Sequence, residues 1–106
     1  MKFDEMDVFS ISTFRSSLIQ IQAKARHGYR NCSQDICDLL RTKTIDEIWN
    51  MNTKLREMGS VRINKIRIPN SHTNQSAAAG YRLIVLCDRN KNRIVLLNIF
   101  PKNGRL

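Results

Sequence analysis

Four basic residues in the second half of the chain have types and spacings suited to binding a phosphate group: Lys65, Arg67, Arg82 and Lys102. Lys65 and Arg67 are two positions apart in an alternating stretch, which is typical of a β-strand. Side chains at this spacing project from one face of a sheet, whereas Ile66 and Ile68 project from the other. Cations held close together on strands bind phosphate through charge-assisted hydrogen bonds. The alternative is a set of separately solvated charges on an exposed face.

Strands must position these residues, and the sequence has stretches typical of strands at 61–68, 80–88 and 93–101. A polar loop, 69–79, and a tight turn, 88–93, join them. Consecutive strands with short connections usually pair, so we expect them to be neighbours in an antiparallel sheet. If helices cover only one face of this sheet, then Lys65, Arg67 and Arg82 project from the open face. Lys102 follows the last strand directly.

The first third of the chain predicts a short strand followed by a helix. Residues 7–11 alternate weakly between apolar and polar. Apolar residues then recur at helical spacing, with Ser12 or Thr13 as the expected N-cap. The pair His27-Gly28 is a plausible end, because glycine commonly follows the last residue of a helix.

Two more helical segments are expected before the pattern changes to strands. Ser33 is a candidate N-cap for the first of them. Thr44 and Glu47 have the spacing of a capping box and predict the start of the second. Leu55 is a candidate for its last apolar position, and Gly59-Ser60 would end it.

This order of elements predicts the fold class. A β-α-α-(α)-β-β-β order favours an α+β fold, in which an N-terminal strand and helices pack on one face of a mainly antiparallel sheet. The 106 residues are of the size of a single domain, residues 1–106.

The net charge indicates the chemistry of the partner. The chain has 18 Lys and Arg against nine Asp and Glu. Residues 60–106 hold nine of the basic residues and a single acidic residue, Asp88. An excess concentrated in this way favours a polyphosphate or an acidic protein as the partner. A solubilising surface is the alternative, although such surfaces usually mix both signs.

The cysteines and the apolar runs bear on location. Cys32, Cys37 and Cys87 cannot all pair within one chain, and they lack the usual spacing of a zinc site. We therefore expect free thiols in a reducing cytosol, with Cys87 as a buried apolar residue. The longest apolar run, Leu83–Cys87, is too short for a membrane span or a signal peptide. No membrane partner is expected.

Three segments, taken together, resemble the RelE/ParE superfamily of toxins from bacterial type II toxin–antitoxin modules. They are Lys65-Ile-Arg-Ile, Gly80-Tyr81-Arg82-Leu-Ile-Val and Ile94-Val-Leu-Leu-Asn-Ile-Phe-Pro-Lys102. The resemblance is close over residues 61–105, and over residues 7–58 it extends only to the order of elements. It implies a small RelE-like fold.

The resemblance also implies an activity. RelE-type members enter the ribosomal A site and cut mRNA without a metal or other cofactor, directing the 2′-hydroxyl at the neighbouring phosphate. Lys65 matches the base or phosphate-contacting lysine of the family, Arg82 matches the arginine of its Gly-Tyr-Arg motif, and Arg67 stands where some members carry a second lysine. We expect further phosphate or RNA contacts from three other basic residues: Arg62, Lys102 and Arg105.

Two departures from the RelE pattern leave roles open. Asn103 replaces an arginine that often follows the lysine after the last strand, and Arg105 is the nearest substitute. The C-terminal tyrosine of many active members has no counterpart here. Tyr81 or Phe100 could stack on a base, although both are typical core residues. The general acid is unassigned, with His72 in the polar loop as a candidate.

The resemblance leaves a second function open. ParE-like members bind and poison DNA gyrase without cutting RNA, and fold cannot separate the two activities. A plain RNA-binding module is a third interpretation. Either toxin interpretation implies an acidic antitoxin from the same operon, with operator DNA bound only through the toxin–antitoxin complex. Ribosome and mRNA are the further partners of the nuclease, and the expected location is the bacterial cytoplasm.

Overall fold

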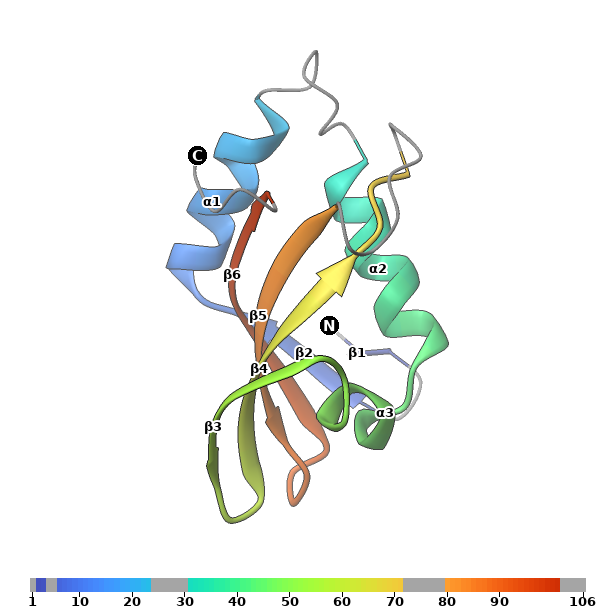
Figure 1. Cartoon of the computed structure of the whole chain (residues 1–106), viewed down its shortest axis with the longest axis vertical. Coiled ribbons are helices and arrows are strands. Elements are labelled where there is room, and N and C mark those ends of the chain that lie inside the picture. The colour runs from blue at the N-terminus through green and yellow to red at the C-terminus, as the bar shows by residue number, and fades with distance from the viewer. Residues whose placement is uncertain (1, 4–5, 24–30, 72–79, 102–106) are drawn as a thin grey trace.

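A computed structural model describes residues 2–3, 6–23, 31–71 and 80–101 (Figure 1). The elements in chain order are β1 (Lys2–Phe3), β2 (Met6–Ser10), α1 (Ser12–Gln22), α2 (Cys32–Thr42), α3 (Ile45–Trp49), β3 (Thr53–Met58), β4 (Val61–Ile68), β5 (Tyr81–Asp88) and β6 (Arg93–Pro101). The bounds of β4 and β6 match those predicted from the sequence.

The described strands form one sheet in the order β1-β2-β6-β5-β4-β3. The β2–β6 pair is parallel, and the other neighbouring pairs are antiparallel. The predicted α+β class and mainly antiparallel sheet are therefore confirmed.

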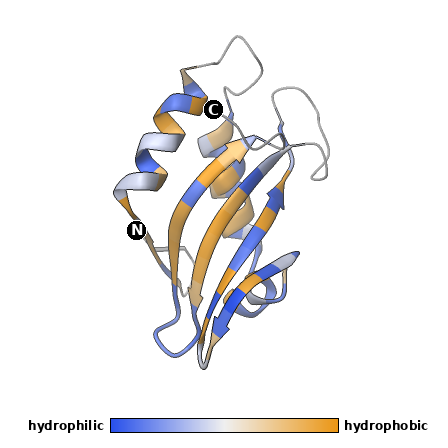
Figure 2. Cartoon of the chain, turned by 60° about the vertical axis from the view of Figure 1, so that its left-hand side comes forward, coloured by the Kyte–Doolittle hydropathy of each residue, from blue (hydrophilic) through white to orange (hydrophobic). Residues whose placement is uncertain are grey.

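The hydrophobic core lies between the sheet and the helices. Along β5 every second residue is buried, beginning with Tyr81 and Leu83, whereas the residues between them are half-buried. Ile66 and Ile68 of β4 point into the same core and are fully buried. In Figure 2 the helices lie behind or beside the sheet, and hydrophobic and hydrophilic residues alternate along β4, whereas β5 and β6 are mostly hydrophobic. The alternation in β4 is typical of a strand with one covered face and one solvated face.

The segment after α3 differs from the prediction. The helix ends at Trp49, and residues 53–58 form strand β3 instead of continuing the helix to Leu55. Every side chain of β3 is exposed, and Leu55 keeps 51% of its surface accessible. The strand forms because its backbone pairs with β4, and Gly59, at φ +57°, closes the connecting turn. Pairing with a neighbour thus replaced burial as the stabilising interaction.

The predicted helix starts agree only in part. Thr44 and Glu47 form the expected capping box, with Thr44 N–H donating to Glu47 Oε1 at 2.9 Å and Glu47 N–H donating to Thr44 Oγ1 at 3.2 Å. The caps predicted for the first two helices are wrong. Ser12 and Ser33 lie inside the first turns of α1 and α2, whose N-caps are Ile11 and Asn31. The predicted helix end at residues 27–28 lies outside the described residues.

The helices are short. Within the described ranges, no helix is both long enough and apolar enough to cross a membrane.

Candidate anion-binding site

Adjacent strands bring the predicted cations together on the open face. Arg67 of β4 and Arg82 of β5 are direct cross-strand partners, and Lys65 is opposite Ile84 one step further along the same face. Opposed residues in an antiparallel pair have Cα atoms only about 4.5–5.5 Å apart. Arg67 is exposed, and Lys65 and Arg82 are half-buried. These three residues are called the cation cluster below.

Carboxylates do not neutralise Lys65 or Arg67 within the described ranges. The ion pairs there join other residues: Lys54 and Arg62 with Glu57, Arg89 with Asp46, and Arg93 with Asp88. Like charges directly opposite each other on a sheet are destabilising. A bound anion would remove that repulsion, so the cation cluster is suited to phosphate.

Hydrogen bonds that involve the backbone hold Arg67 and Arg82 in place. The Arg67 N–H donates to Asn52 Oδ1 at 2.7 Å, just before β3 begins. Arg82 Nη1 donates to the Tyr81 carbonyl oxygen at 3.1 Å. At the start of β5, a Cβ on Gly80 would overlap the Ile68 carbonyl oxygen and lie 2.9 Å from the Asn70 nitrogen. The glycine of the Gly-Tyr-Arg segment therefore allows the close approach of backbones that places Arg82 beside Arg67.

The two candidate stacking residues have different environments. Phe100 of β6 is the register partner of Arg82 and is half-buried, so it extends the row formed by Arg67 and Arg82 onto a third strand. Tyr81 is fully buried in the core. The suggestion that Tyr81 could stack on a base is therefore wrong, because its ring lies on the covered face of the sheet.

The grouping of Arg62 with the phosphate-binding residues is also corrected. Arg62 is an odd number of positions from Lys65 and Arg67 along β4, so it belongs to the opposite, covered face. Its Nε donates to Asn64 Oδ1 at 2.7 Å, and its guanidinium lies 5.9 Å from the centroid of the Trp49 ring. Arg62 thus contacts α3 instead of joining the cation cluster.

A polar anchor for α3, centred on Asn64, was missed by the sequence analysis. Asn64 is fully buried, and its Nδ2 donates to the carbonyl oxygens of Ile48 at 2.9 Å and Trp49 at 2.8 Å. Arg89 also contacts α3, because its guanidinium lies 4.6 Å from the centroid of the Trp49 ring and pairs with Asp46 at 2.7 Å. An asparagine in an otherwise strand-like pattern was the available signal.

Three of the predicted site residues, His72, Lys102 and Arg105, lie outside the described residues. The structure therefore brings together Lys65, Arg67, Arg82 and Phe100 from the predicted set.

The three cysteines are free thiols. Cys32 and Cys87 are buried, and Cys37 is partly exposed. Burial raises the pKa of Cys32 and of Cys87 to about 12, so both thiols are protonated at neutral pH. In the part of the chain that the structure describes, no three His, Cys, Asp or Glu side chains are grouped to hold a metal ion.

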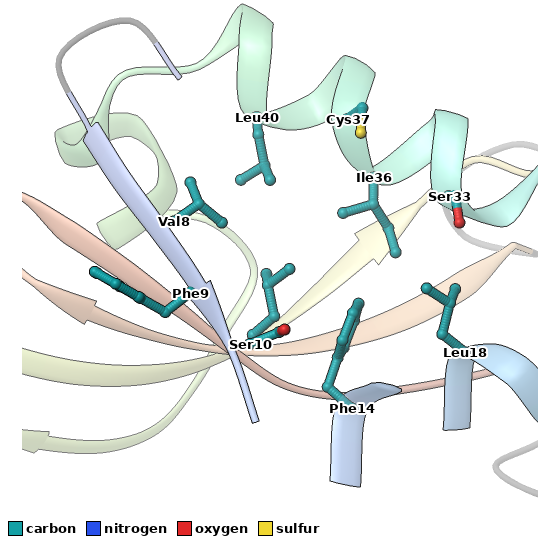
Figure 3. A pocket seen from close by; sticks show the side chains of 10 residues that line it. Val8, Phe9, Ser10, Phe14, Leu18, Ser33, Ile36, Cys37 and Leu40 are labelled. Carbon is teal, nitrogen blue, oxygen red and sulfur yellow. The ribbon is translucent and has the colours of Figure 1, made fainter. Parts of the chain in front are cut away.

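A separate apolar pocket of about 470 Å³ lies between β2, α1 and α2 (Figure 3). Val8, Phe14, Leu18, Ile36 and Leu40 direct their side chains toward a common space from these three elements. The helical periodicity of the sequence predicted apolar faces but not that α1 and α2 would leave a pocket between them.

The comparison with solved structures identifies the fold. The chain superposes on a chain of the crystal structure of the archaeal RelE–RelB complex from Pyrococcus horikoshii OT3, with a TM-score of 0.57 and 18% identity over 100% of both chains. The chain has a RelE-like fold. Neither the family models nor the curated protein sequences match it. At this identity the similarity shows the fold alone, so the function has to be argued from the site.

Proposed function

We propose that this RelE-like protein is the toxin of a type II toxin–antitoxin module and that it cleaves mRNA on the ribosome without a metal cofactor. The observation that carries the proposal is the cation cluster. Arg67 is opposite Arg82 and Lys65 lies on the same sheet face, and none of the ion pairs among the described residues involves Lys65 or Arg67. The RelE-like fold supports it.

The proposed reaction uses the 2′-hydroxyl of the RNA as the nucleophile. Lys65 accepts the proton of this hydroxyl or contacts the phosphate, as the new P–O2′ bond forms and the P–O5′ bond breaks. The five-coordinate phosphate gains negative charge, which Arg67 and Arg82 stabilise. The 5′ oxygen leaves with a proton from a general acid, for which His72 remains the candidate. The products are a 2′,3′-cyclic phosphate and a 5′-hydroxyl end.

Other contacts to the RNA follow from the same arrangement. Phe100, the register partner of Arg82, is proposed to stack on a base. Lys102 follows β6 by one residue and Arg105 by four, and both are proposed to contact phosphates.

The test is cleavage of mRNA on programmed ribosomes by the purified protein, with mapping of the new 3′ ends. We expect cuts within the A-site codon and a loss of about 100-fold or more in rate for Arg82→Ala. Arg56→Ala is the matched control, because Arg56 is an exposed strand arginine in β3, outside the cluster. Full activity of Arg82→Ala would contradict the proposed site. Growth arrest without any cleavage would favour the ParE-like alternative, binding of DNA gyrase.

We further propose an acidic antitoxin encoded in the same operon as the partner. The similar solved structure is of RelE in complex with RelB, and the +8 charge of residues 60–106 favours an acidic binding segment. Operator DNA would be bound only through this complex. Co-expression with the product of the adjacent gene should give a stable complex that resists moderate salt. The absence of any complex would contradict this partner.

A further inference from the structure

A second pocket, of about 460 Å³, adjoins the cation cluster. It lies where α2 and the residues after α3 meet the end of β4, and Arg67 forms part of its wall. The pairing of β3 with β4 stops at Thr53 and Lys65, so Arg67 lies beyond the last paired residue of β4 at this edge of the sheet. Arg67 therefore belongs both to the cation cluster and to the lining of this pocket. Its volume falls in the range of small-molecule sites, about 300–1,000 Å³.

The lining combines apolar walls with charges of both signs. Leu39, Met51 and Pro69 supply apolar surface. The carboxylates of Asp35 and Asp38 lie on the α2 side together with Lys43, the residue directly after the helix, whereas Arg67 belongs to the strand side. A nucleotide matches the carboxylates and Arg67, with a flat base carrying N–H donors at one end and an anionic phosphate at the other. The apolar residues would contact the faces of the base, and the carboxylates would accept hydrogen bonds from its N–H donors.

The two carboxylates of α2 have different environments. Asp35 is only 7% exposed, and its Oδ2 accepts from the Ser71 N–H at 3.1 Å, so it ties the segment after β4 to the helix. Asp38 is exposed, and its Oδ1 accepts from Gln34 Nε2 at 2.8 Å. This bond orients the Asp38 carboxylate, and each oxygen has two acceptor positions, so capacity remains for a ligand.

We propose that this pocket binds a guanine base of the RNA and that Asp38 reads it. Guanine presents N1–H and the N2 amino group side by side, and a carboxylate accepts from both. Adenine and cytosine present one donor beside an acceptor, and uracil presents one donor between two acceptors. The inference rests on the proposed function in one respect: it takes the anion at the cation cluster to be an RNA phosphate.

The experiment titrates the full-length ¹⁵N-labelled protein with 3′-GMP, 3′-IMP and 3′-AMP and follows amide shifts by NMR. We expect 3′-GMP to shift the amides of Asp38 and Leu39 and to bind about five- to tenfold more tightly than 3′-IMP, which lacks the amino group. Asp38→Asn should abolish the preference, because its side-chain amide replaces one acceptor with a donor. Asp7→Asn, at an exposed carboxylate on β2, is the charge-matched control and should leave the preference unchanged. Arg67→Ala should weaken all three nucleotides alike.

The outcomes separate this inference from the proposed function. Equal affinity for the three nucleotides, or a guanine preference that survives Asp38→Asn, overturns the guanine pocket even if Arg82-dependent cleavage is found on ribosomes. A guanine preference that depends on Asp38, in a protein that cuts no mRNA, upholds the pocket and overturns the nuclease.

Discussion

Replacing Arg67 with threonine should stabilise the protein and weaken its binding to RNA. Arg67 is exposed and opposes Arg82 directly, so the change removes a like-charge contact and little packed surface. Its N–H can still donate to Asn52, and threonine is well suited to a strand. Relief of one cross-strand pair is worth about 0.2–1 kcal/mol. For a domain of this size the melting temperature should rise by roughly 1–6 °C.

The matched control is Arg56→Thr on β3. Arg56 is also exposed on a strand, and its partner Ile63 is four positions from Arg67 along β4, about 13 Å. Ile63 is about 7 Å from Lys65, so Arg56 remains within the Debye length of about 10 Å of one cluster residue, but it opposes neither Arg67 nor Arg82. Arg56→Thr therefore reports the change in net charge and in strand propensity, and the difference between the variants reports the direct pair of Arg67 and Arg82.

The assay is urea denaturation of both variants at 0.1 M and 1 M NaCl. At 0.1 M we expect Arg67→Thr to have the higher free energy of unfolding. At 1 M the Debye length falls to about 3 Å, and the difference should nearly vanish. A lower stability of Arg67→Thr at 0.1 M, or a difference unaffected by salt, would refute the interpretation of Arg67 and Arg82 as a repelling pair. In parallel, the dependence of RNA binding on salt should weaken by about one phosphate contact for Arg67→Thr.

Three further predictions concern a buried asparagine, two glycines and the two buried cysteines. Asn64→Ala should lower the free energy of unfolding by about 2–4 kcal/mol in urea denaturation, because the buried carbonyls of Ile48 and Trp49 lose their donor; a change below about 0.5 kcal/mol would contradict the anchor. Gly80→Ala should destabilise the fold by at least about 1 kcal/mol, since its Cβ would meet the Ile68 carbonyl, whereas Gly59→Asn, at a turn with open space, should have little effect. Folding raises the pKa of Cys32 and of Cys87 from 9.0 to about 12. Between these pH values the folded protein therefore binds more protons than the unfolded protein, so the free energy of unfolding should fall as pH rises above 9.0. Urea denaturation of the protein and of a Cys87→Ala variant at pH 8 and pH 10 measures this effect. If the difference in the free energy of unfolding between the two proteins is the same at both pH values, the raised pKa of Cys87 is contradicted.

The cation cluster could be predicted from the sequence because its geometry is local. The two-residue period of 61–68 places Lys65 and Arg67 on one face, and short connections make the next strand its neighbour. The register that sets Arg67 opposite Arg82 could not be predicted, since the polar loop 69–79 leaves the offset between the strands open. Pairing along the whole of β4 and β5 decided it.

Other assignments failed where charge or polarity was interpreted without its surroundings. Arg62 was grouped with the other cations because basic residues look alike in a charge count, yet its position in β4 places it against Trp49 and Asn64. The strand at 53–58 was missed because it buries none of its side chains, and hydrophobic periodicity detects only elements that do.

By itself, the sequence determined the α+β class, the bounds of β4 and β6, the capping box at Thr44 and the common face of Lys65 and Arg67. These features depend on patterns within a few residues, for which backbone geometry and local hydrogen bonds suffice. Only the tertiary structure decided that Arg67 opposes Arg82, that Arg62 contacts α3 and that a pocket beside Arg67 brings carboxylates of α2 close to the cation cluster. Each of these depends on how elements distant in the sequence pack together, because burial and charge at one residue are set by neighbours that the local pattern does not contain.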